Sequence, residues 1–487
     1  MLFNSIEFLF FFPIVTVLFF ILPHRFRWQL LLGASCFFYM FFKPEYILIL
    51  AATIVVDYFA GILIDEAPTE KLKKKYLLIS LVANIGVLAV FKYFNFINNN
   101  VTGLAYVFGF HNPIPALNML LPIGLSFHTF QAMSYTLEIS RGNYKAEKHF
   151  GIYALYVMFY PQLVAGPIER PQNIIYQFYE EKKFDYDRVM SGLRLMLWGF
   201  LKKIVIADNL TTYTDGVFNN LHTQTSIAIV ISIFFFAFQI FCDFSAYTDI
   251  ARGAARVMGY ELIKNFNYPF RSRSVTEFWR RWHMSLTSWF NDYLFTPLVI
   301  KNRRSISFGI IFALMITFSL SGLWHGAAWT YVSFGVMHGF ATSYEFITKK
   351  WRSRLSKKIN PFIYNHISQL LTFLFACFTW IFFRANTMDD AFYILSRIPG
   401  IFNEINHWSI TRSKPIFDES MSNLGHIYCF MFIIVLEGLH YLDNHYQIFH
   451  LVLKQNKFIR WTVYYSMMLI IIFFASATSH RFIYFQF

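Results

Sequence analysis

The apolar run from Ser307 to Phe340 constrains the fold of this chain more than any other segment. It contains no acidic or basic residue except His325 and His338. Because about 20 helical residues already cross the hydrocarbon core of a bilayer, the run is too long for one span and must break. Ser321-Gly322 and Gly326 are the natural places, so we expect His325 to lie on broken backbone at membrane depth. An ionisable side chain held there is costly and indicates function, and the alternative is a hydrogen-bonded core histidine.

The rest of the chain is also rich in hydrophobic residues and poor in charged ones. Of its 487 residues, 56% are hydrophobic and only 14% are charged, whereas soluble domains carry roughly 25% charged residues. We therefore predict an all-α polytopic integral membrane protein with about 11–13 transmembrane helices and additional re-entrant or interfacial helices. The apolar stretches lie at about 6–22, 28–42, 46–64, 76–95, 116–139, 152–167, 190–207, 226–242, 307–340, 368–384, 426–442 and 460–478. Residues 1–487 are expected to form a single membrane domain.

The net charge of +14 is concentrated in loops between these stretches. Three basic segments, 24–27, 71–75 and 141–148, alternate with the segment 96–115, which carries no charge apart from a possible one on His111. By the positive-inside rule the three basic loops are cytoplasmic and the N-terminus lies outside. Residues 349–358 are also expected to be cytoplasmic. The positive charge therefore indicates topology, and no nucleic-acid partner is expected.

Polar groups gather between about residues 239 and 340, which we predict to be the catalytic core. Within it, Thr276 is expected to cap a helix that begins there. Aromatic side chains and one histidine recur at helical spacing on one face of this helix, at Trp279, Trp282, His283, Leu286, Trp289 and Phe290. An ordinary interfacial helix accounts for the tryptophans and for Arg280 and Arg281, but not for a histidine on the aromatic face. We therefore regard His283 as a second candidate functional residue.

Two motifs then suggest a family. Residues 278–286 (FWRRWHMSL) and 321–326 (SGLWHG) resemble the two histidine motifs of the membrane-bound O-acyltransferase family. The resemblance extends over nearly the whole chain and is strongest for the bacterial branch that takes part in alginate O-acetylation. Its further motifs are 121–131 (LPIGLSFHTFQ), 165–170 (AGPIER), 243–249 (DFSAYTD), 265–269 (NFNYP), 380–385 (WIFFRA) and 482–487 (FIYFQF).

The resemblance implies an acyltransferase of the bacterial inner membrane with a central tunnel. It implies transfer of an acetyl group from a cytoplasmic thioester, most simply acetyl-CoA, to an extracytoplasmic polysaccharide such as alginate. A periplasmic acetyltransferase partner and membrane lipid are the expected partners, with no metal and no permanently bound cofactor. The alternatives are peptidoglycan O-acetylation, D-alanyl transfer to teichoic acid, or an exporter without acyl-transfer chemistry. An exporter would favour two matching halves, which this sequence lacks.

The two histidines receive different roles. An acceptor hydroxyl must lose its proton as it attacks the thioester, and a neutral imidazole with a pKa near ~6.5 suits that task, so we expect His325 to be the general base. His283 would orient the thioester or donate a hydrogen bond to the oxyanion, and an acyl-histidine intermediate is a variant. His128 stands in a motif where an aromatic residue such as tyrosine is expected, and we interpret it as a substitution without catalytic meaning. His338 is expected to be packed or to line the pore. Candidate substrate-binding residues are Trp282, Asn291, Asp292, Trp324, Arg280 and Arg281, where arginine suits phosphate recognition.

Overall fold

The computed structural model describes residues 1–118, 121–303, 305–411, 423–476 and 480–483. Helices make up 78% of the protein, and the described residues contain no strand, which confirms the predicted all-α fold. The chain divides into two compact units: unit 1 comprises Met1–Met196 and Thr248–Lys264, and unit 2 comprises Leu197–Tyr247 and Asn265–Phe487. The single membrane domain and its catalytic core at about 239–340 stay predictions.

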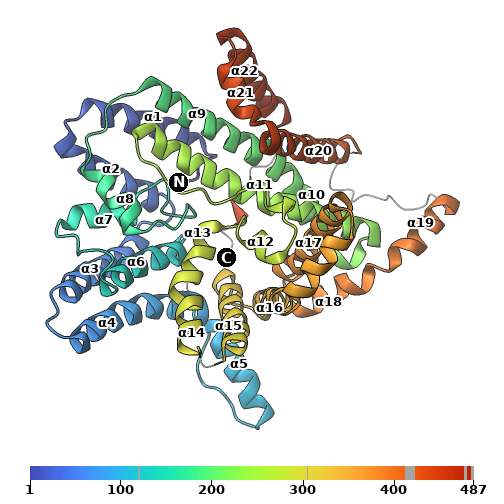
Figure 1. Cartoon of the computed structure of the whole chain (residues 1–487), viewed down its shortest axis with the longest axis horizontal. Coiled ribbons are helices and arrows are strands. Elements are labelled where there is room, and N and C mark those ends of the chain that lie inside the picture. Colours follow the sequence, from blue (N-terminus) through green and yellow to red (C-terminus); the bar gives the residue numbers. More distant parts are fainter. Residues whose placement is uncertain (119–120, 304, 412–422, 477–479, 484–487) are drawn as a thin grey trace. The chain divides into compact units, whose positions relative to one another are not determined.

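Unit 1 contains the N-terminal helices of the chain. The helices are α1 (Ile6–Ile21), α2 (His24–Met40), α3 (Tyr46–Asp65), α4 (Glu70–Leu88), the π-helical η1 (Ala89–Tyr93), α5 (Phe94–Val107), α6 (Leu125–Ser140), α7 (Phe150–Met158), α8 (Pro171–Tyr179) and most of α9 (Tyr186–Phe200). Helices α3, α4 and α6 pack together, as Figure 1 shows.

Buried polar contacts join these three helices. Both carboxylate oxygens of Asp57 on α3 accept hydrogen bonds from Asn84, and one of them also accepts from Ser80, with distances of 2.6–2.9 Å. Nearer the start of α3, Thr53 lies 2.7 Å from Nε2 of His128 on α6. His128 is thus a packed core residue of unit 1.

Unit 2 carries the segments with the two histidine motifs. Its helices are η2 (Leu201–Ala207), α10 (Asp208–Asn219), η3 (Leu221–Thr223), the first part of α11 (Ser226–Met258), η4 (Pro269–Arg271), α12 (Val275–Trp279), α13 (Met284–Phe290), η5 (Asn291–Phe295), α14 (Thr296–Lys301), α15 (Ile306–His325), α16 (Trp329–Lys358), α17 (Pro361–Arg384), α18 (Met388–Arg397), α19 (Gly400–Thr411), α20 (Asn423–Tyr446), α21 (Ile448–Lys454) and α22 (Lys457–Phe474). The basic segment 349–358 forms the end of helix α16, and its cytoplasmic location stays a prediction.

Helices α15 and α16 form a tight hairpin that fixes the position of His325 (Figure 1). The predicted break after His325 is confirmed, because α15 ends at His325 and α16 begins at Trp329. The predicted break at Ser321-Gly322 is wrong, since α15 continues through both residues. Gly322 is needed for packing instead: a Cβ atom there would lie 2.2 Å from the carbonyl oxygen of Tyr331 on α16.

A buried ion cluster joins η2, α10 and the first part of α11. The ammonium of Lys203 is 2.7 Å from a carboxylate oxygen of Asp208 and 2.7 Å from one of Asp243, and all three side chains are buried. The other oxygen of Asp243 accepts a hydrogen bond from the backbone N–H of Ile483 at 2.6 Å. Two motifs of the sequence, 243–249 and 482–487, therefore meet at this cluster, although residues 484–487 lie outside the described part of the chain.

The described residues include seven helices that are long and apolar enough to cross a membrane. They are Tyr46–Asp65, Glu70–Val107, Ser226–Met258, Ile306–His325, Pro361–Arg384, Leu424–Tyr446 and Lys457–Phe474, with the shorter apolar helix Ile6–Ile21 in addition. The protein is therefore a multi-pass membrane protein. The apolar stretch 152–167 forms no span, because α7 ends at Met158 and buried turns follow. The total of about 11–13 spans stays a prediction.

Candidate active site

The His283 segment starts with helix α12, whose first turn is held by two side chains. Ser274, and not the predicted Thr276, is the N-cap, and its hydroxyl accepts a hydrogen bond from the N–H of Glu277. The N–H groups of Val275 and Thr276 donate to the carboxylate of Glu345 on α16, at 2.7 and 2.9 Å. These bonds satisfy N–H groups that a helix start leaves without partners.

The helix predicted through His283 is broken in the structure. Helix α12 ends at Trp279 and α13 begins at Met284, and His283 adopts a left-handed conformation with φ of 44°. The chain leaves the helical path because it pairs with the segment before it: the N–H of Met284 donates to the carbonyl of Asn265, and the N–H of Asn267 donates to that of Arg281, both at 2.9 Å. A non-glycine residue in this conformation costs about 1–3 kcal/mol and often marks a functional site.

The side chain of His283 is fully buried at this turn. Its Nδ1 lies 3.3 Å from Oδ1 of Asn265, and its ring packs edge-on against Phe244 with the centroids 4.7 Å apart. Burial lowers the pKa of His283 well below its ordinary value of 6.5, and the nearby His325 lowers it further. His283 is therefore a neutral imidazole at physiological pH.

The second candidate, His325, is the last residue of α15 and is 3% exposed. Its ring centroid lies 6.4 Å from that of His283, although the two residues belong to different sequence motifs. The ring of Trp324 packs against both, with centroids 6.0 Å from His283 and 5.0 Å from His325. Phe383 covers His325 from α17 at 5.4 Å. The result is a pair of imidazoles within an aromatic wall.

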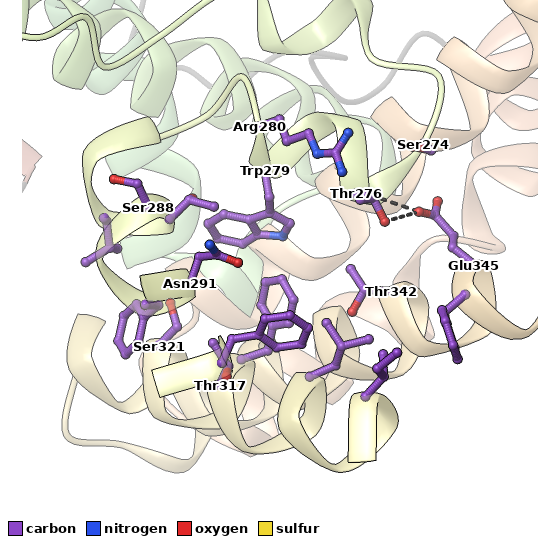
Figure 2. A pocket seen from close by; sticks show the side chains of 18 of the residues that line it. Ser274, Thr276, Trp279, Arg280, Ser288, Asn291, Thr317, Ser321, Thr342 and Glu345 are labelled. Atoms are coloured by element: carbon purple, nitrogen blue, oxygen red, sulfur yellow. Dashed lines mark hydrogen bonds between the residues drawn. The ribbon is translucent and has the colours of Figure 1, made fainter. Parts of the chain in front are cut away.

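A cavity of about 930 Å³ lies beside this pair in unit 2, between α12–α13 and the hairpin of α15 and α16 (Figure 2). Neither histidine lines it, but the next residue after His283, Met284, does, as does Ser321, which precedes His325 by one helical turn. Arg280, Lys349 and Arg352 give the cavity three cations, and Glu345 is its one carboxylate. The lining residues are Ser274, Thr276, Trp279, Arg280, Met284, Leu286, Thr287, Ser288, Phe290, Asn291, Phe295, Ile310, Leu314, Thr317, Phe318, Ser321, Thr342, Glu345, Phe346, Lys349 and Arg352.

Two of the predicted substrate-binding residues line the cavity and the other four do not. Arg280 and Asn291 line the cavity, where Figure 2 shows both side chains. Asp292, which accepts a hydrogen bond from Asn291 at 3.0 Å, does not line it, and neither does Trp324. Arg281 is held by Glu277 at 2.9 Å.

Trp282 belongs to the aromatic core of unit 2. It is buried, stacks on Phe278 with a centroid distance of 5.4 Å, and contacts Trp380 at 5.2 Å. These contacts indicate that Trp282 shapes the turn before His283. Trp282 is not among the residues that line the cavity.

Of the two alternatives expected for His338, packed or pore-lining, the structure shows the packed one. Its Nδ1 accepts a hydrogen bond from the indole N–H of Trp279 at 3.1 Å, and its Nε2 lies 3.1 Å from the hydroxyl of Thr379. Both ring nitrogens are therefore engaged in the side-chain packing of α12, α16 and α17.

Sequence reasoning missed three residues of this site. Lys349 and Arg352 were assigned to a topology signal, and only the length of helix α16 brings them to the cavity. Asn265 was recognised only as part of a motif, because its partner His283 follows 18 positions later. Among the described residues, no group of three or more His, Cys, Asp or Glu is arranged to hold a metal ion. The prediction that no cofactor is permanently bound stays a prediction.

This fold and this buried pair of histidines define a multi-pass membrane protein with an imidazole site enclosed by its helices. The chain belongs to the membrane-bound O-acyltransferase family, whose family model matches residues 116–386 and includes both histidines. The protein is therefore an acyltransferase, which confirms the resemblance found in the sequence. Family membership argues against an exporter without acyl-transfer chemistry.

Three proteins similar to this chain are named for different acyl-transfer reactions. A probable alginate O-acetylase of Pseudomonas aeruginosa is 34% identical over 80% of this chain and 73% of its own length. A peptidoglycan O-acetyltransferase of Helicobacter pylori is 30% identical over 82% of this chain and 80% of its own. A teichoic acid D-alanyltransferase of Bacillus subtilis is 31% identical, over 55% of this chain and 70% of its own.

Proposed function

We propose that this protein transfers an acetyl group from acetyl-CoA on the cytoplasmic side across the membrane to an acceptor hydroxyl, for O-acetylation of an extracytoplasmic polysaccharide such as alginate. The observation that carries the proposal is the pair of buried histidines, 6.4 Å apart between ring centroids, beside a cavity with three cations. The names of the O-acetylating relatives, which match at least 80% of this chain, support the acetyl group.

The cavity is the proposed donor site. Arginine and lysine bind phosphate oxygens by charge-assisted hydrogen bonds, so Arg280, Lys349 and Arg352 suit the phosphates of coenzyme A. A donor of that charge cannot cross a bilayer and must enter from the cytoplasm. Lys349 and Arg352 belong to the basic segment that the positive-inside rule assigns to the cytoplasmic side. The apolar lining nearer Ser321 would accommodate the thioester arm.

In the proposed reaction, the oxygen of the acceptor hydroxyl attacks the thioester carbonyl carbon. A C–O bond forms, the C–S bond breaks, and His325 takes the hydroxyl proton, which then passes to the leaving thiolate of coenzyme A. His283 orients the reacting groups. The aromatic wall of Trp324 and Phe383 limits the access of water, which would otherwise hydrolyse the thioester. A general base of this kind contributes about 10²–10⁴-fold to a rate.

The cellular setting is part of the proposal. The protein lies in the bacterial inner membrane with its N-terminus outside, and a periplasmic acetyltransferase completes delivery to the sugar. Peptidoglycan is the second candidate acceptor, because the Helicobacter pylori relative matches 82% of this chain. D-alanyl transfer to teichoic acid has weaker support, since that relative matches only 55%.

The test uses the purified full-length protein with acetyl-CoA labelled in the acetyl group. Alginate oligosaccharides and peptidoglycan fragments are supplied as acceptors, each with and without a periplasmic extract. We expect label on alginate and release of free coenzyme A with the wild type, and a loss of at least 100-fold with His325→Ala. His128→Gln is the matched control, because it changes a buried histidine held by Thr53 in unit 1. Equal acetyl transfer by His325→Ala and wild type would refute the proposed role of His325, and label on peptidoglycan alone would change the acceptor.

A further inference from the structure

Asn265 contacts the turn at His283 through both its side-chain amide and its backbone. Its Oδ1 accepts a hydrogen bond from the N–H of Ser285 at 3.1 Å and from the Ser285 hydroxyl at 3.0 Å, and lies 3.3 Å from Nδ1 of His283. Its backbone carbonyl accepts from the N–H of Met284 at 2.9 Å. Asn265 is 1% exposed. One residue therefore holds three consecutive residues of the turn.

These contacts determine which ring nitrogen of His283 carries the proton. A backbone N–H can only donate, so the atom of Asn265 beside the N–H of Ser285 must be the amide oxygen, and the side chain cannot be rotated to exchange its oxygen and nitrogen. An amide oxygen can only accept. The Nδ1 of His283 must therefore be the donor in this contact, and the lone pair of the neutral ring lies on Nε2.

We propose that Asn265 is a positioning residue that holds His283 in the tautomer with the proton on Nδ1 and a hydrogen-bond acceptor at Nε2. In this tautomer a neutral His283 cannot donate from Nε2 to an oxyanion, so one of the two roles considered for it from the sequence is excluded. This part of the inference rests on the proposed function. In that reaction, the role of His283 is to accept a hydrogen bond.

The distance between the two rings indicates how His283 can act on His325. A centroid separation of 6.4 Å is too long for a direct hydrogen bond between two imidazoles and suits a bridge through the oxygen of one water molecule, with two hydrogen bonds of about 2.8 Å. When one ring nitrogen of His325 takes the hydroxyl proton and the ring becomes positively charged, its other N–H donates to the water oxygen. A hydrogen of the same water is accepted by Nε2 of His283, which stabilises the charge. Asn265 thus acts on His325 through His283.

The tautomer is measured by the ¹⁵N chemical shifts of histidine-labelled full-length protein, in which His283→Gln identifies the His283 signals. We expect a protonated Nδ1 and an unprotonated Nε2 in the wild type. Asn265→Leu has similar volume but no acceptor, so this pattern should be lost. Ser285→Ala is the matched control, because it removes another donor to the same oxygen and leaves the His283 contact. A proton on Nε2 in the wild type, or the same pattern in Asn265→Leu, would overturn the proposal.

Kinetics separate positioning from general stability. With labelled acetyl-CoA, Asn265→Leu should lower kcat by about 10- to 100-fold and leave KM for the donor within about twofold, since the base keeps its chemistry and loses its support. Asn265→Asp keeps the acceptor oxygen and should restore both the tautomer and most of kcat. An Asn265→Leu protein with wild-type kcat would refute the positioning role. The tautomer of His283 is measured in the absence of acetyl-CoA. If the protein proved not to transfer acetyl groups, the proposed function would fail, but the measured tautomer would still test the role of Asn265.

Discussion

Gly322 offers a direct test of how the fold positions His325. The residue faces α16 at the closest approach of the hairpin, where a Cβ atom would lie 2.2 Å from the Tyr331 carbonyl oxygen and 3.0 Å from the backbone of Gly335. Contacts under 3.0 Å are essentially never seen for real Cβ atoms, and here both neighbours are backbone, so neither can rotate away. Gly322→Ala must therefore push the two helices apart by about 1 Å, and a misplacement of that size can cost a reaction about 100-fold.

The magnitude follows from a comparison with Gly86→Ala. Gly86 also lies within a helix, α4, and a Cβ atom there has nothing within 4 Å. Replacing glycine by alanine favours either helix by about 1 kcal/mol, so this gain cancels when the two variants are compared. The difference that remains is the crowding at Gly322, which we expect to lower the free energy of unfolding by about 1–3 kcal/mol relative to Gly86→Ala.

The assay is unfolding of the purified protein in mixed micelles by increasing sodium dodecyl sulfate, followed by tryptophan fluorescence. Acetyl transfer by the two variants is measured in parallel. We expect Gly86→Ala to match or exceed the stability of the wild type with unchanged activity, and Gly322→Ala to lose both. If Gly322→Ala were as stable and as active as Gly86→Ala, the hairpin would not depend on this close approach, and our account of how His325 is positioned would be wrong.

Three further predictions concern charge. Lys203→Met should lower the free energy of unfolding by about 3–5 kcal/mol, because it leaves Asp208 and Asp243 buried without their cation, and thermal unfolding would detect this. Lys349→Met should raise KM for acetyl-CoA about tenfold with kcat unchanged, whereas Lys357→Met, on the same helix but away from the cavity lining, should leave both constants unaltered. Because burial holds the pKa of His283 below 6.5, the unfolded state takes up its proton first, and stability should fall with decreasing pH below about 6.5 by up to about 1.4 kcal/mol per pH unit. Stability curves of the wild type and His283→Gln that are parallel below this pH would contradict the last prediction.

The features that the sequence predicted correctly are those that depend on local pattern. The apolar run 307–340 was too long for one span, and it does break after His325. The same length argument could not tell whether Ser321-Gly322 was a second break, because a glycine inside a helix serves equally for close packing. Only the position of Tyr331 on the neighbouring helix shows that Gly322 is there for packing.

The features that the sequence failed to predict depend on partners far away in the chain. The spacing of aromatic residues around His283 favours a continuous helix, and intrinsic propensity offers no reason to stop it. The helix stops because Asn265 and Asn267 provide hydrogen-bond partners for the turn. Likewise, Thr276 had the residue type of a cap, but Ser274 is the cap and Glu345 from α16 binds the remaining N–H groups.

Both histidines therefore lie where the backbone departs from regular helix. Different contacts stabilise the backbone at each of the two positions. The turn at His283 is strained by about 1–3 kcal/mol and persists because Asn265 binds it through both backbone and side chain. His325 needs no strain, because the end of α15 is fixed by the glycine-mediated contact with α16. A side chain at a helix end or a tight turn can point across a gap between helices, which a side chain in the middle of a packed helix cannot do as readily. This explains how two residues 42 positions apart bring their rings within 6.4 Å of each other in a chain built almost entirely of helices.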